Sequence, residues 1–185
     1  MASAFTHAVV GAALTPLAPP AQRNGRLAVE LAALAALPDL DVLGFGLGID
    51  YAHPLGHRGL THSLLFAALL APLVVWLLHR DVRSGSHDWW ALVGLCFAAT
   101  ASHGVLDAFT DAGLGIGFFI PFDNRRYFMP WRPLATSPLE PSAFFSHWGL
   151  RVMANEIAWV WLPTAACVVA VWLRRRRRDA NRRWR

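Results

Sequence analysis

The sequence predicts an all-α fold, a polytopic membrane helical bundle of about five helices, with three full spans and two short N-terminal helices. Of the 185 residues, 55% are hydrophobic and only 16% are charged, whereas a soluble domain carries about 25% charged residues. The apolar residues gather in five runs, and the three longest approach the ~20 residues that cross a bilayer core. We expect one membrane-embedded domain over 1–173 and a basic cytoplasmic tail over 174–185.

Proline and glycine mark the limits of these runs. The first two runs are too short to cross a bilayer, so we expect half-spanning, re-entrant or internally packed helices there. A long segment rich in glycine, proline and aromatic residues, 110–148, precedes the last helix; it is either a functional loop or an aromatic belt at the headgroups. The expected helices cover 5–17, 27–37, 62–78, 89–109 and 155–173.

The arginines predict the orientation of the bundle. The chain has no lysine, and an up-and-down path places 12 of its 17 arginines on one side of the membrane. The positive-inside rule makes that side the cytoplasm. We therefore expect a multi-pass protein of the bacterial inner membrane, with a cytoplasmic C-terminus and its other face toward the periplasm.

The same path collects histidines and aspartates on the side opposite the arginine-rich one. Ionisable groups in or near a membrane are costly and are candidates for function. His103 and Asp107 lie four residues apart, so they share one face of a helix. A local hydrogen bond between them is the simpler alternative. The candidate metal ligands on this side are His7, Asp39, His57, His62, His103 and Asp107.

Two further segments carry polar groups at that side. The turn Pro38-Asp39-Leu40-Asp41 has two carboxylates at the end of an apolar helix; it is a solvated turn or part of a metal site, since zinc binds carboxylates and imidazoles. Between His57 and Ser63, Thr61 or Ser63 can cap the following helix. Arg58 can bind a phosphate or a phospholipid headgroup.

Taken together, these blocks resemble a known family, the YdjM-like, SOS-regulated inner-membrane metal-dependent hydrolases of bacteria. The matching elements are Thr6-His7 with Gly11, the 38–41 turn, 57–59 running into 61–63, and 102–104 with Leu106-Asp107. More distantly, the pattern is similar to zinc-dependent phospholipase C and the P1-type nucleases. The second histidine–carboxylate helix of those enzymes is not found here, so the resemblance implies one or two metal ions rather than three.

The expected function is metal-assisted hydrolysis of a phosphoester in a lipid or lipid-linked substrate at the membrane face. The cofactor would be a divalent metal, zinc or alternatively manganese, which activates water. Asp41 and Arg58 are the expected catalytic residues, and Arg125 and Arg126 would bind substrate phosphate. The expected partners are membrane lipids and a small or lipid-linked phosphoester, with no nucleic acid.

Two alternatives come from other classes of protein. One is a metal-binding membrane protein without catalysis, a carrier or a scaffold. The other is bis-histidine haem ligation by His62 and His103, which leaves the nearby aspartates without a role, because carboxylates favour a hard or borderline ion.

Overall fold

A computed structural model describes residues 1–138 and 141–183 of the chain, and the backbone alone for 141 and 178–183. The described residues form helices, turns and isolated bridges with no β-strand, so the all-α prediction is confirmed for them. Two helices are long and apolar enough to cross a membrane, α4 (His87–Ala108) and the helix over His147–Arg177. The apolar segment Leu64–Leu78, expected as a third span, is shorter than a crossing requires. The number of spans therefore stays a prediction.

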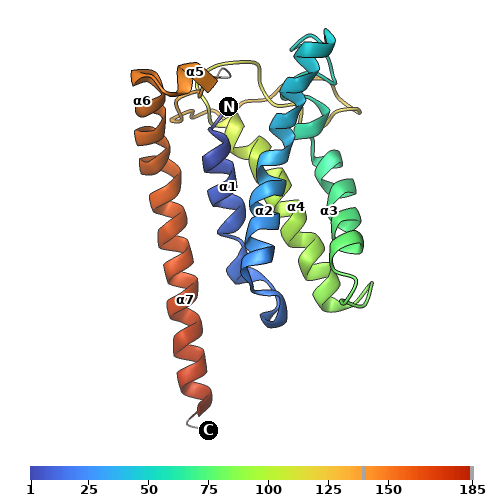
Figure 1. Cartoon of the computed structure of the whole chain (residues 1–185), viewed down its shortest axis with the longest axis vertical. Helices are drawn as coiled ribbons and strands as arrows, with labels where there is room; N and C mark the ends of the chain where they lie inside the picture. The colour runs from blue at the N-terminus through green and yellow to red at the C-terminus, as the bar shows by residue number, and fades with distance from the viewer. Residues whose placement is uncertain (139–140, 184–185) are drawn as a thin grey trace.

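The first two helices lie side by side at the centre of the bundle (Figure 1). Ser3 accepts a bond from the backbone amide of Thr6 and so begins α1 (Ala4–Ala12); Asn24 begins α2 (Gly25–Ala36) in the same way. A Cβ on Gly11 would lie 2.2 Å from the carbonyl oxygen of Leu31. Only glycine therefore permits this approach of α1 to α2, as close helix contacts in membranes require.

The turn at residues 38–41 is longer than the sequence suggested. It opens a 3₁₀ helix, η3 (Leu37–Leu47), which ends at Gly48 in the left-handed conformation. Pro38 explains the change, because proline cannot donate the hydrogen bond that continues the α-helix. Asp39 stays buried at the start of η3, while Leu40 and Leu43 are exposed.

The next two helices form an antiparallel pair, in which α4 passes behind α2 and α3 stands to the right of α2 (Figure 1). Ser63 caps α3 (Leu64–Leu78), as expected, and follows a short 3₁₀ turn, η4 (Leu60–His62). Ser86 caps α4, which runs for 22 residues. The apolar core fills the half of the bundle away from the polar cluster, at Leu27, Leu31, Ala35, Ala71, Val75, Leu92, Cys96 and Ala99.

The long connection after α4 is an ordered cover over one end of the bundle. Two isolated bridges, Thr110 with Leu134 and Ile116 with Tyr127, hold it together. Ile116, Ile120 and Leu134 are buried in it. This segment is therefore part of the folded domain.

The last helix starts earlier than expected, and that boundary prediction was wrong. A short helix, α5 (Pro141–Phe144), leads into α6 (His147–Glu156), a π-helical turn, η5 (Ile157–Trp161), and α7 (Leu162–Arg183). Ser146 caps α6. The polar composition of 147–156 resembled a loop. The 174–183 part of the predicted tail continues α7, whereas 184–185 lie outside the described residues.

The bundle has two chemically different ends. The turns before α2 and between α3 and α4 lie at the same end as the C-terminus (Figure 1), and they carry Arg23, Arg26, Arg80 and Arg83. The N-terminus, η3, η4 and the cover lie at the other end. These four arginines are therefore separated in the fold from the candidate His/Asp ligands, whereas Arg58 and Arg126 lie at the ligand end.

Candidate metal centre

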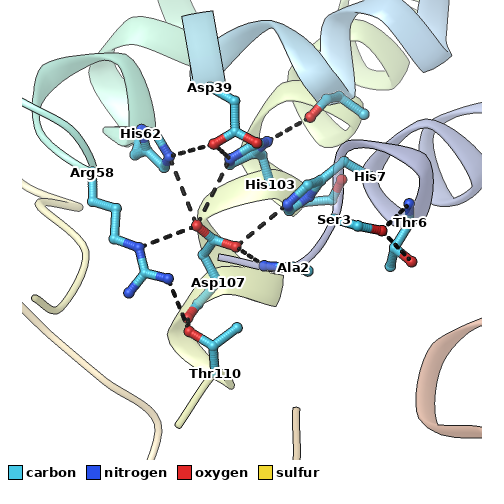
Figure 2. A network of polar contacts seen from close by, with 12 residues as sticks. Ala2, Ser3, Thr6, His7, Asp39, Arg58, His62, His103, Asp107 and Thr110 are labelled. Atoms are coloured by element: carbon cyan, nitrogen blue, oxygen red, sulfur yellow. Dashed lines mark hydrogen bonds and ion pairs between the residues drawn. The ribbon is translucent and has the colours of Figure 1, made fainter. Parts of the chain in front are cut away.

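Four buried side chains from three elements converge at the end of the bundle opposite the arginines. Asp39 comes from η3, His62 from η4, and His103 and Asp107 from the last turns of α4 (Figure 2). One ligand atom from each of the four lies within 4.8 Å of the others. The structure thus brings together four of the six predicted ligands.

Hydrogen bonds orient both imidazoles with Nε2 toward the cluster. The Nδ1 of His103 lies 2.7 Å from the carbonyl oxygen of Ala35. A carbonyl only accepts, so Nδ1 carries a proton and Nε2 is the ring atom directed at Asp39 and Asp107. The Nδ1 of His62 lies 3.2 Å from Oδ2 of Asp41, which orients that ring in the same way. Carboxylate and carbonyl partners of this kind accompany metal-binding histidines.

The spacing of the ligand atoms suits a single ion. Oδ1 of Asp39 lies 3.2 Å from Nε2 of His103 and 3.8 Å from Nε2 of His62. Oδ2 of Asp107 lies 3.9 Å from each of those nitrogens. Two ligand atoms held ~2.1 Å from a tetrahedral ion would be about 3.4 Å apart, so a small adjustment would complete the coordination.

Unpartnered polar atoms point to the same place. Among the described residues, the buried side-chain nitrogens and oxygens without a hydrogen-bond partner belong to these four residues or to the adjoining His7 and Arg58, apart from Nε1 of Trp89. A buried polar group left unbonded costs about 1–3 kcal/mol. A cation would satisfy the carboxylate oxygens and imidazole lone pairs together. The residues present therefore fit a divalent metal, and they are Asp39, His62, His103 and Asp107.

His7, the early histidine of α1, lies against this group rather than among its closest atoms. Its ring stacks on that of His103, with centroids 3.7 Å apart. Its Nε2 is 3.3 Å from Oδ1 of Asp107, the oxygen that also accepts the amide of Ala2 at 2.7 Å. His7 is placed to orient Asp107 or to become an additional ligand.

Arg58 is fully buried, and its guanidinium is engaged by the protein. Nε lies 3.3 Å from Oδ2 of Asp107, while the terminal nitrogens donate to Thr110 Oγ1 and to the carbonyls of Ala112 and Leu114. Its backbone is left-handed, with φ +63°. Arg58 thus joins the metal cluster to the cover, and its catalytic role stays a prediction.

Asp41 and His57 form a second buried group beside the first. Asp41 Oδ1 lies 2.7 Å from Nδ1 of His57, and Oδ2 accepts from Thr61 Oγ1 at 2.6 Å. Asp41, His57 and His62 also lie within 4.8 Å of one another. Because both oxygens of Asp41 already accept hydrogen bonds, this group resembles an outer support for His62 more than a second ion site.

Electrostatics in this part of the chain favour a charged network. Burial lowers the pKa of His62, but its contacts with Asp39 and Asp41 outweigh burial and raise that pKa to about 8. Burial would raise the pKa of Asp39, yet the charge of His103 and hydrogen bonds from both histidines hold it below its usual range. The same balance, with hydrogen bonds from His57 and His62, lowers the pKa of Asp41.

The two predicted substrate arginines differ in their surroundings. Arg125 is exposed and pairs with Asp123 at 2.8 Å. Arg126 is partly buried and donates to the backbone carbonyls of His57 and His53, both at 3.0 Å. A phosphate at the surface would compete with Asp123 for Arg125, whereas Arg126 fixes the loop that carries His57. Their binding of substrate stays a prediction.

Glu156 ends α6 beside the start of the first helix. It is fully buried, and its carboxylate accepts bonds from the backbone amide and hydroxyl of Ser3 and from the hydroxyl of Thr6. Glu156 therefore ties the last helix to the start of α1. The only sequence signal was an isolated acid in an apolar segment.

These features define an integral membrane helical bundle. At the end that carries the N-terminus, it holds a buried His/Asp cluster fit for a divalent cation. Residues 1–179 match the family model described as YdjM inner membrane protein, so the chain belongs to the YdjM family. The chain is also 38% identical over 143 residues to "Inner membrane protein YbcI" of Escherichia coli (strain K12), covering 77% of this chain and 81% of that protein. These matches support a location in the bacterial inner membrane. No solved structure matches significantly.

Proposed function

We propose that this chain is a membrane-bound metal-dependent hydrolase that cleaves a phosphoester in a lipid or lipid-linked substrate. The observation that carries the proposal is the convergence of four buried ligand atoms within 4.8 Å of one another, flanked by Nε of Arg58 at 3.3 Å from Oδ2 of Asp107. Two carboxylates and two imidazoles suit zinc, and manganese as an alternative. Since the second buried group is already hydrogen-bonded, we favour one ion.

The chain's own residues would bind and orient that ion. Asp39, His62, His103 and Asp107 are the proposed ligands, and Asp41 is a positioning residue that fixes the ring of His62. The guanidinium of Arg58 offsets the negative charge of Asp107. A zinc ion, when bound, polarises a phosphoryl oxygen and lowers the pKa of a water ligand to ~7.

Catalysis requires that the ion keep a position open to water and substrate. Four protein ligands fill a tetrahedral site, which is the usual structural arrangement of zinc. An open position therefore requires five- or six-coordination, or one ligand that is only weakly bound. Asp39, the least buried ligand at 8% exposure, is where we expect substrate to enter.

The depth of the site favours an amphiphilic substrate. The cluster lies where apolar helices meet the polar cover, and Arg125 is exposed on that cover. A phosphate at headgroup level would find cationic side chains there. The arginines at the opposite end favour a cytoplasmic C-terminus, which would place the cluster on the periplasmic face.

The second candidate function is a metal-stabilised scaffold or carrier without catalysis. The complete four-ligand set favours this second candidate, because structural zinc sites leave no coordination position open to water. The coordination number of the bound ion distinguishes the two. Cobalt substituted for the native ion would give a visible spectrum typical of four-coordination in a scaffold and of higher coordination in a hydrolase.

The first experiment is elemental analysis of the detergent-purified protein with matched variants. We expect about one ion per chain in the wild type and its loss in His103→Ala and Asp39→Ala. His87→Ala and Asp88→Ala serve as controls, because both side chains are exposed at the other end of α4. These controls should keep the ion.

Metal in the wild type and both controls, with loss in both cluster variants, would justify a phosphoester screen. The absence of metal after reconstitution with zinc and manganese would overturn the proposal and leave a buried proton-binding network. Equal metal content in all variants would place the ion elsewhere. Bound metal without hydrolysis of any lipid phosphoester, together with a four-coordinate cobalt spectrum, would favour the scaffold.

A further inference from the structure

An apolar groove separates α1 from the last helix on the outside of the bundle. Two cavities of about 300 Å³ each lie along it, and they share Val10, Pro163 and Thr164. The first reaches toward the cover at Leu106 and Trp131. The second follows α1 and α7 toward the arginine-rich end. We call this pair of cavities the α1–α7 groove.

The groove exists because the last helix packs loosely on the rest of the bundle. Only 11% of the most apolar 18-residue stretch of this helix is buried inside the protein. Near the cover, Glu156 and Trp161 bond to Ser3 and Thr6 and hold this helix against α1. Beyond those contacts the two helices leave space between them. Loose packing of two membrane helices leaves a crevice that bilayer hydrocarbon can enter.

The lining and length of the groove match a lipid chain. None of the described residues that line the two cavities is charged. Trp131 and Trp159 meet edge to face at 5.1 Å at its upper end, and tryptophan favours the headgroup level. From Trp159 to Val171 the helix rises about 18 Å, close to half of the ~30 Å hydrocarbon core. The groove thus spans about one leaflet.

The groove and the metal centre are carried by the same turns of two helices. Val10 lies one turn after His7 on α1, and Leu106 directly precedes Asp107 on α4. A lipid whose chain occupied the groove would therefore have its polar head at the end of the bundle that carries the cluster. A groove elsewhere on the surface of the bundle would not bring the head of its lipid to the metal centre.

We propose that the α1–α7 groove binds a hydrocarbon chain of a membrane lipid and that this lipid belongs to the substrate class of the metal centre. The second half of this statement rests on the proposed function. The substrate is then an amphiphile with at least one long chain, held by that chain while its phosphoester stands at headgroup level. A soluble phosphoester would lack this anchor.

The test is native mass spectrometry of the full chain in detergent with added diacyl phosphatidylethanolamine. Val10→Phe and Thr164→Phe fill the groove from its two sides. Val29→Phe is the matched control, because Val29 is 72% exposed on α2. We expect one lipid per chain to survive activation in the wild type and in the control, and none in either groove variant. Metal content and thermal unfolding, measured on each variant, report whether it is folded.

Retention of the lipid by folded groove variants would overturn the inference. So would a wild type that holds no more lipid than those variants, or a dimer that Val10→Phe dissociates, since a second copy would then fill the groove. Loss of lipid from both groove variants with their metal retained supports it. If lipid binds as expected but the chain holds no metal, the proposed hydrolase fails while the lipid site stands, so the two failures are distinguishable.

Discussion

Replacement of Asp41 by asparagine tests whether a residue outside the ligand set controls metal affinity. Four donors converge on this carboxylate: Nδ1 of His57 at 2.7 Å, Oγ1 of Thr61 at 2.6 Å, and Nδ1 of His62 and the amide of Arg58, both at 3.2 Å. An asparagine keeps the shape but has one accepting oxygen, so its NH₂ group must face either His57 or the other three donors.

The magnitude follows from which donors the amide faces. If its NH₂ faces His62, Nδ1 of that ring must accept and the proton moves to Nε2, which removes the lone pair offered to the metal. Loss of such an outer partner typically weakens metal binding 10–100-fold, which corresponds to about 1.4–2.8 kcal/mol. We expect Asp41→Asn to fall in that range and Asp39→Ala to bind more weakly still.

The assay is competition for zinc between the purified chain in detergent and a chromophoric chelator. Asp50→Asn is the control, because Asp50 lies in the same connection with an exposed side chain. The reasoning is refuted if folded Asp41→Asn binds zinc within about twofold of the wild type, because the predicted 10-fold minimum would then be missed.

Three further predictions concern packing, pH and the last helix. Gly11→Ala should destabilise the protein by about 1–3 kcal/mol, because its Cβ would meet the Leu31 carbonyl. Gly94→Ala, whose Cβ meets nothing within 4 Å, should stabilise the protein by about 0.5–1 kcal/mol. Equal unfolding temperatures for the two variants would contradict this prediction. Zinc affinity should rise about tenfold per pH unit below pH 8 and level off above it, because zinc displaces the proton that His62 holds with a pKa of about 8. A zinc affinity that does not change with pH would exclude His62 as a ligand. Without metal, the effect of pH has the opposite sign: the raised pKa of His62 stabilises the fold at low pH, and that stabilisation is lost as the pH rises through about 8. Glu156→Gln should lower stability by about 1–3 kcal/mol, since an amide cannot accept from all three donors of Ser3 and Thr6; an unchanged unfolding temperature in detergent would show that this link carries little energy.

Much of the site could be predicted because it depends on chain path rather than on detailed packing. Alternating apolar helices place residues far apart in sequence at one end of a bundle, and this argument grouped Asp39, His62, His103 and Asp107 before any geometry was known. The i, i+4 spacing of the α4 pair is a local property of the helix.

The remaining details depend on side-chain directions that sequence patterns do not encode. Arg58 was expected to meet a phosphate, but its guanidinium turns inward to Asp107 and the cover. Glu30 has Arg26 one turn before it on its own helix, but it contacts His79 at 3.0 Å across the bundle. In both cases a residue distant in sequence pairs with the charged side chain, because a buried charge needs a partner. The spacing of apolar residues along a helix does not indicate which distant residue that partner is.

The left-handed backbone at Arg58 sets two energetic terms against each other. A residue other than glycine in that conformation costs roughly 1–2 kcal/mol, whereas removing one partner of a buried ion pair costs about 3–5 kcal/mol. The guanidinium that faces Asp107 and bonds to the cover therefore outweighs the backbone cost. Random mutagenesis screened for heat resistance should then retain arginine at position 58, and enrichment of glycine there would show that the guanidinium contributes little to folding.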